Sequence, residues 1–239
     1  NSIKHQHPTF PNKFMLDVGI GPMHFGVLEN QEINTAWQPG VTPWDFQMTQ
    51  AGYNALALSN FSSGQIVKYV HPGSGESIAL QPQQLQYTND LNQIQAIANP
   101  QSVNAVVQNE DELYWTGAFG PGFDIRWQTQ TARLDKRLIV DQASRWPTPT
   151  AQIIAGGNPV ARLQFIFQVS TGIDIYVNDV LWNRAVNNPV DTSGYVEFRL
   201  NATGETAWWF NLPRSNGAPI EDQDPDEIID PAPRKYFPN

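Results

Sequence analysis

Cysteine is absent from this chain of 239 residues, and charged side chains are scarce. Without cysteine there is no disulfide and no thiolate metal ligand, which fits the cytosol, a virion, or an extracellular protein stable without bridges. No apolar run approaches the 18 or more residues of a membrane-spanning helix, so we expect no membrane contact. The net charge of −9 argues against a nucleic-acid partner, because binding phosphates requires clustered Lys and Arg.

Uncharged amides and turn formers are plentiful instead. The chain has 21 Gln and 20 Asn, which do much of the solubilising, together with 19 Pro and 17 Gly. This composition favours many short strands joined by turns, since long amphipathic helices need more Ala, Glu, Lys and Leu. We therefore predict an all-β protein with an antiparallel β-sandwich or jelly-roll-like domain, a second small β unit and extended terminal arms.

The domain division follows from where strand patterns stop. Residues 1–13 are polar and interrupted by proline, which predicts an N-terminal arm. Period-2 alternation then runs through a main β domain at 14–144. Two prolines near residue 148 separate it from the second β unit at 145–214. Residues 215–239 are acidic and Pro-rich, which predicts an extended tail.

The most regular stretch is AFGPGFDIRWQTQTARLDKRLIVD, residues 118–141. Its alternation predicts a hairpin with an apolar face toward the core and a charged face toward solvent. The side chains expected to be buried are Phe123, Ile125, Trp127, Leu138 and Val140. Those expected to be at least partly exposed are Asp124, Arg126 and Arg137. Lys136 is the exception, since it shares the apolar face.

The segment before this hairpin contains Gly120-Pro121-Gly122. Proline fixes its own φ near −65°, so we expect at least one of the two glycines to adopt a positive φ and turn the chain. Further upstream, residues 90–98 (DLNQIQAIA) are compatible with one helical turn. Their Ile-x-x-Ile spacing is too short to distinguish a helix from a strand.

No set of residues has the pattern of a catalytic or metal site. The charges of the hairpin alternate in sign, as cross-strand ion pairs on an exposed face do. His5 and His7 could chelate a metal but lie in the expected arm. The acidic run at 221–230 lacks the central Gly and final Glu of a calcium loop. We therefore expect no enzymatic activity, no cofactor and no metal.

Eight tryptophans raise the question of sugar binding, because exposed indoles stack on pyranose rings. Trp37, Trp44 and Trp146 lie beside proline-containing turns, where an indole can be exposed. Packing in the core or in loops is the favoured interpretation for each. A carbohydrate-binding or adhesin module that uses these three residues is the alternative function.

Residues 44–141, about two fifths of the chain, resemble known β-rich proteins. The segment Phe119 to Trp127 (FGPGFDIRW), continuing to Leu134 and Val140, is similar to a segment in β-rich modules of bacterial surface proteins. It is closer still to structural proteins of tailed bacteriophages and prophages. The resemblance implies a structural domain of a virion or of a cell surface, and it implies no catalytic residues.

We therefore expect a structural virion protein, capsid- or tail-associated, that acts by protein–protein assembly. Its partners would be other virion proteins and further copies of itself. A location at the cell surface or outside the cell is the alternative. Within the tail the large apolar side chains expected to anchor a partner are Ile220, Ile228, Ile229, Tyr236 and Phe237.

Overall fold

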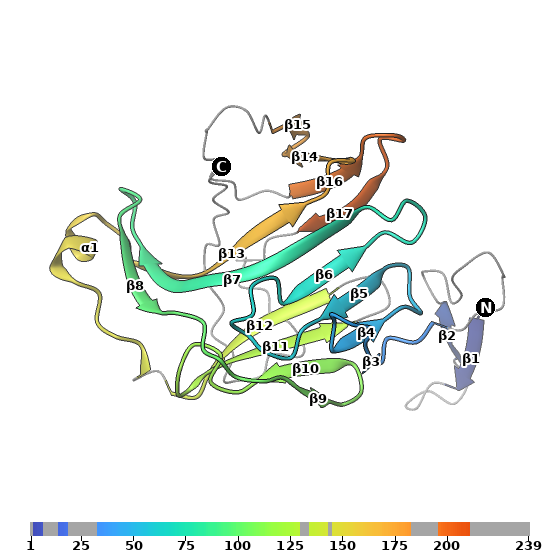
Figure 1. The fold of residues 1–239 in the computed structure, drawn as a ribbon, viewed down its shortest axis with the longest axis horizontal. Helices are drawn as coiled ribbons and strands as arrows, with labels where there is room; N and C mark the ends of the chain where they lie inside the picture. The colour runs from blue at the N-terminus through green and yellow to red at the C-terminus, as the bar shows by residue number, and fades with distance from the viewer. Residues whose placement is uncertain are drawn as a thin grey trace.

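The computed structural model describes residues 2–6, 14–18, 33–129, 134–142, 145–182 and 196–210. Within these ranges the fold is all-β, as predicted, with antiparallel strands in four sheets and one short α-helix, α1 (Ala151–Ala155) (Figure 1). The composition explains this outcome, because turns rich in Gly, Pro and Asn separate strands rich in β-branched and aromatic residues.

The largest sheet has seven strands in the order β13-β7-β6-β5-β4-β3, with β8 paired to β7. Its strands are β3 (Gln38–Pro39), β4 (Phe46–Met48), β5 (Asn54–Ala57), β6 (Val67–Val70), β7 (Ser77–Thr88), β8 (Ile94–Ala98) and β13 (Val160–Val169). A four-stranded sheet, in the order β12-β11-β10-β9, shares a hydrophobic core with it. The four strands are β9 (Val106–Gln108), β10 (Glu112–Trp115), β11 (Phe123–Thr129) and β12 (Leu134–Val140).

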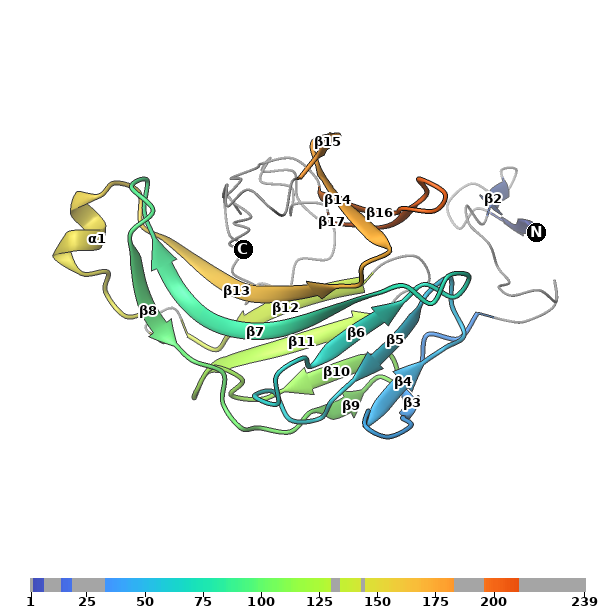
Figure 2. The same cartoon turned by 45° about the horizontal axis from the view of Figure 1, so that its top comes forward.

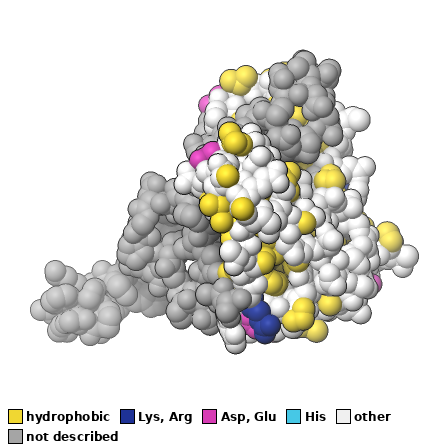
Figure 3. Space-filling model, turned by 90° about the vertical axis from the view of Figure 1, so that its left-hand side faces the viewer, with side chains coloured by type: hydrophobic (Ala, Val, Ile, Leu, Met, Phe, Trp, Pro, Cys, Tyr) yellow, Lys and Arg dark blue, Asp and Glu magenta, His cyan; other side chains and the backbone are white. Residues whose placement is uncertain are grey.

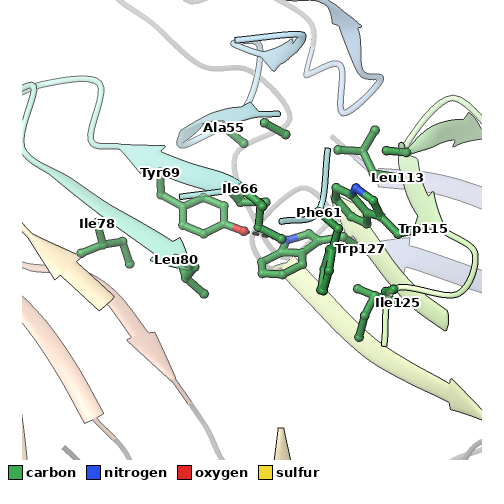
Figure 4. Close-up of a cluster of buried hydrophobic side chains, with 14 of the residues drawn as sticks. Ala55, Phe61, Ile66, Tyr69, Ile78, Leu80, Leu113, Trp115, Ile125 and Trp127 are labelled. Carbon is green, nitrogen blue, oxygen red and sulfur yellow. Dashed lines mark hydrogen bonds between the residues drawn. The ribbon is translucent and has the colours of Figure 1, made fainter. Parts of the chain in front are cut away.

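The core between these two sheets is built from large side chains of both (Figure 4). Trp115 and Trp127 of the four-stranded sheet are almost completely buried, as are Leu80 of the other sheet and Ile66 just before β6. One polar contact crosses the core: the Trp127 Nε1–H donates to the Tyr69 hydroxyl at 2.6 Å. The contact satisfies two polar groups that burial removes from water.

The hairpin of β11 and β12 has the predicted faces. Phe123 pairs with Val140, and Ile125 pairs with Leu138. Four of the five expected core side chains are buried, namely Phe123, Ile125, Trp127 and Val140. Leu138 is only partly buried, because β12 is an edge strand, although it packs against the core. Asp124, Arg126 and Arg137 are partly exposed, which confirms the prediction for the polar face.

Both glycines before β11 have positive φ, which confirms the predicted turn. The values are +100° at Gly120 and +83° at Gly122. Asp141 N donates to Gly122 O at 3.1 Å, so the turn is tied to the residue that follows β12. The chain therefore reverses in the left-handed region that glycine occupies without steric cost.

The strands β7 and β13 pair over most of their length and curve strongly (Figure 2). The register shifts between Gln164 and Phe165, so that Gln83 on the β7 side has no partner. Pro82 lies directly at this irregularity, opposite Phe165. A proline has no N–H to donate, and a β-bulge is one of the few places where a sheet accepts it. The bulge and the bend carry the end of β7 away from the sandwich.

The third sheet follows β13 and has the order β15-β14-β16-β17. Its strands are β14 (Ile173–Val177), β15 (Val180–Leu181), β16 (Val196–Leu200) and β17 (Thr206–Phe210). The Phe198 ring stacks on Phe167 of β13, and the Trp208 ring lies edge-on to His71 after β6. The sequence placed a domain boundary between residues 144 and 145. β13 follows this boundary but pairs with β7, which precedes it, so one sheet contains strands from both sides of the boundary.

A separate two-stranded sheet joins β1 (Ser2–Gln6) to β2 (Phe14–Val18). β1 lies inside the segment expected to be an extended arm, so at least this part of residues 1–13 is a paired strand. The expected tail, 215–239, lies outside the described residues.

Candidate functional site

On the charged face of the β11–β12 hairpin, Asp124 is bound to the turn that precedes it. Asp124 accepts two hydrogen bonds, from Gly117 N at 2.6 Å and from the Tyr114 hydroxyl at 2.7 Å. Gly117 belongs to the turn that precedes β11 and has a φ of +67°. Asp124 therefore holds the turn in place, and its oxygens already have protein partners.

Arg126, the next charge of the hairpin, is partly buried and faces Glu112, which is only 5% exposed. Arg126 lies opposite Arg137 on β12, and its Nη1 is 3.7 Å from Glu112 Oε1 on β10. Lys136 lies opposite Trp127 and shares its face, as the sequence pattern indicated, but the residue is exposed, with its Nζ 4.2 Å from the centre of the Phe165 ring. Among the residues that the structure describes, no three His, Cys, Asp or Glu side chains are grouped to hold a metal ion.

Replacing Asp124 tests its role in the turn. Asp124→Ala should lower the free energy of unfolding by about 2 kcal/mol, because Gly117 N–H and the Tyr114 hydroxyl lose a charged acceptor. Urea denaturation measures this change. Tyr114→Phe removes only one of the two hydrogen bonds and should cost about half as much. A change within about 0.5 kcal/mol for Asp124→Ala would show that the turn does not depend on this carboxylate.

The three tryptophans considered for sugar stacking do not form one surface. Trp37 is 5% exposed and its Nε1–H donates to Asp111 O at 3.1 Å, so its ring belongs to the core. Trp146 packs edge-on against Phe123, at the start of β11, whereas Trp37 lies beside Asp111 and the last residue of β11. The seven residues of β11 separate these two rings by roughly 20 Å. Trp44 is partly exposed in the turn before β4.

The structure instead displays an apolar surface at the end of the molecule that carries α1. We call it the apolar tip and define it by Leu91, Ile94 and Ile154. Their exposed fractions are 67%, 59% and 54%. They come from three backbone segments: the β7–β8 turn, the start of β8, and α1. Hydrophobic side chains are spread over this end, and charged ones are few (Figure 3).

Asn89 is the residue that holds the apolar tip together. It is only 4% exposed. Its Oδ1 accepts from Leu91 N and from Gln93 N, which shapes the β7–β8 turn. Its Nδ2 donates to Ile153 O at 3.0 Å, which ties the turn to α1 across 64 positions of the sequence. One buried amide thus satisfies backbone groups in both segments.

Further contacts attach α1 to the hairpin. Thr150 caps α1 and donates its own N–H to Gln95 Oε1 at 2.8 Å. Asp90 Oδ2 accepts from Asn158 Nδ2 at 2.8 Å. At Gly156 a Cβ atom would lie 1.9 Å from Asn89 Nδ2, so only glycine allows this close approach. The exposed aliphatic side chains therefore stand on a closely packed support.

The base of the apolar tip is aromatic. Tyr87 is buried and donates its hydroxyl to Pro147 O at 2.8 Å, and its ring lies 6.2 Å from that of Trp146. Burial raises the pKa of the Tyr87 phenol, so this donor stays protonated at neutral pH. These contacts join residues 146–150 to the end of β7 and fix where α1 begins.

Comparison with protein families, with curated proteins and with solved structures finds no match. The site is therefore interpreted from its own geometry. No helix within the described ranges is both long enough and apolar enough to cross a membrane.

The apolar tip was not predicted from the sequence. Residues 90–98 contain the whole of β8, a strand, where the sequence spacing was also compatible with a helical turn. Residues 151–155 form α1, although the sequence placed them in the second β unit at 145–214. One available signal was the pair of adjacent aliphatics at Ile153 and Ile154, of which one is buried and the other is exposed. The five expected tail anchors, Ile220, Ile228, Ile229, Tyr236 and Phe237, lie outside the described residues.

Proposed function

We propose that this protein is a structural component of a bacteriophage virion, capsid- or tail-associated, and that it assembles with other virion proteins through the apolar tip. The observation that carries the proposal is the exposure of Leu91, Ile94 and Ile154 on a rigid support. An exposed cluster of aliphatic side chains at one end of a soluble protein is typical of an interaction surface.

The energetics suit repeated assembly. Fully burying an aliphatic side chain of this size contributes about 1.5–3 kcal/mol. Because the three residues are still 54% to 67% exposed, covering them completely contributes about 3–5 kcal/mol in total. The hydrogen bonds of Asn89 order the support before any partner arrives, which reduces the entropy lost on binding. A contact of this strength is weak alone but sufficient where many copies bind side by side.

The virion part of the proposal is supported by the resemblance of residues 119–127 and their continuation to structural proteins of tailed phages. The hairpin that carries this resemblance is a packed scaffold in which Asp124 stabilises a turn. Such a role suits a structural domain. The apolar tip lies on other strands and supplies the surface that such a domain needs for assembly.

The proposal is tested by replacing the apolar tip in the phage or prophage that encodes the chain. Ile94→Asp combined with Ile154→Asp places two charges where a partner would bury aliphatic groups, so incorporation into density-banded particles should fall at least tenfold. Val41→Asp is the matched control, because Val41 is equally exposed but lies in the turn between β3 and β4. Particle content is measured by quantitative mass spectrometry, and circular dichroism confirms that each variant folds.

Two results would contradict the proposal in different ways. If the wild-type chain is not found in purified particles, the virion assignment is wrong. If the double variant enters particles as well as the wild type does, the apolar tip is not the assembly surface.

A further inference from the structure

The apolar tip sets clear requirements for whatever covers it. Its three aliphatic side chains are surrounded by amides, and many of these amides already bond to one another or to backbone groups. Within residues 89–95 and 150–158 the only charged residue is Asp90, whose carboxylate accepts from Asn158. The surface therefore offers hydrophobic contact and almost no charge. A binding partner for this surface needs several apolar side chains. It can also carry acidic residues, because Asp90 is the only like charge in these two segments.

Residues 215–239 of this chain have that chemistry. Six Asp and Glu alternate with Ile220, the pair Ile228-Ile229, and the pair Tyr236-Phe237. Five prolines remove backbone N–H donors, so a segment of this kind binds mainly through its side chains and is a poor partner for a sheet. By contrast, the polar face of the third sheet holds ion pairs, in which Arg199 binds Asp179 and Glu197, and it offers an apolar segment little hydrophobic contact.

We infer that the apolar tip receives the segment 215–239 of a second copy of this chain. The inference rests on the proposed function, because it assigns an occupant to the same surface. Leu91, Ile94 and Ile154 are each more than half exposed, so none of the described strands covers them. The last described residue, Phe210 of β17, is separated from Ile220 by ten residues, which span up to about 35 Å. That reach is enough to bridge neighbouring molecules.

Such a contact joins two different surfaces of the same protein. The tip of one copy binds the segment of the next copy, which leaves the second copy's tip open for a third. A heterologous interface of this kind produces rings where the rotation closes and filaments where it does not. Both outcomes are suited to a repeated particle. This head-to-tail arrangement also predicts which oligomers form when two variants are mixed.

The test uses the full-length chain and two variants that each lose one half of the contact. The tip variant is Ile94→Asp with Ile154→Asp, and the segment variant is Ile228→Asp with Ile229→Asp. Sedimentation velocity should show oligomers for the wild type that grow with concentration, and monomers for each variant alone. An equimolar mixture should form one-to-one dimers and nothing larger, because only one intact pair of surfaces remains. Val41→Asp and Gln223→Asp are controls that add charge elsewhere on the surface and in the segment, and both should associate like the wild type.

The opposite results separate the inference from the proposed function. If the segment variant associates like the wild type while the tip variant does not, another partner surface occupies the tip; the inference fails and the proposed function stands. If the mixture stays monomeric, or if the wild type is itself monomeric, the segment does not bind between copies and the inference fails. Incorporation into particles then remains an independent test of the tip.

Discussion

Trp127→Ala is expected to lower the free energy of unfolding by about 3–5 kcal/mol, the largest single effect that we anticipate. Trp127 is 1% exposed and packs edge-on against Phe165 of β13, with ring centres 5.9 Å apart. Its removal leaves a cavity between the sheets. It also leaves the Tyr69 hydroxyl without its donor, and burial raises the pKa of Tyr69, so ionisation offers no relief.

Urea denaturation followed by circular dichroism measures this loss. Trp127→Phe keeps an aromatic ring and much of the volume but removes the N–H and part of the indole, so it should cost clearly less, about 1–2 kcal/mol. Val106→Ala on the exposed strand β9 is the control and should change stability by no more than about 0.5 kcal/mol. A loss below about 1 kcal/mol for Trp127→Ala would mean that the two sheets do not share this core.

Gly122→Val should destabilise the protein by about 3 kcal/mol, because two costs combine. The φ of +83° is unfavourable for any residue with a Cβ, and more so for a β-branched one. A Cβ at this position would also lie 2.4 Å from Asp141 Oδ1, a carboxylate that accepts two hydrogen bonds from Arg145. The side chains of Asp141 and Arg145 are each 44% exposed, so their ion pair has to shift to admit the new side chain.

Gly120→Val provides the matched comparison for the same turn. Gly120 has a φ of +100°, but a Cβ there would meet no atom within 4 Å. The substitution should therefore cost only the backbone strain, about 1–2 kcal/mol. Thermal unfolding of both variants shows whether the order is correct. Equal losses would indicate that Asp141 moves aside freely, and unchanged melting temperatures for both would mean that the turn does not require glycine.

The β11–β12 hairpin was predictable because its information is local. Alternation places Ile125 and Trp127 on one face and Asp124 and Arg126 on the other, and the pairing partner lies only a few residues further along the chain. The same alternation also places Lys136, a charged residue, on the apolar face opposite Trp127. The pair Gly120 and Gly122 was likewise predictable, since a proline between glycines before a strand requires a turn.

The apolar tip was not predictable in the same way because its contacts are distant in sequence. Asn89 gives no sign in the sequence that its side chain bonds Ile153, 64 positions later. The exposed state of Ile94 depends on β8 being a strand at the end of a curved sheet, and that curvature depends on a register shift opposite Pro82. Trp37 is a second case in which a contact distant in sequence decides exposure, and here the contact buries the ring. Its neighbouring proline allowed an exposed ring, but the contact with Asp111 buries it.

The pairing of β7 with β13 has a consequence for synthesis of the chain on the ribosome. Thr88 is made 72 residues before its partner Val160, and Ile78 is made 91 residues before Val169. Throughout that interval one edge of β7 has no strand beside it, and an open edge of this length invites pairing with other nascent chains. The extra residue Gln83 breaks the regular spacing of backbone groups along that edge, which makes the edge a poorer template for a foreign strand. The irregularity that accompanies the bend in the finished sheet thus also protects the unfinished one.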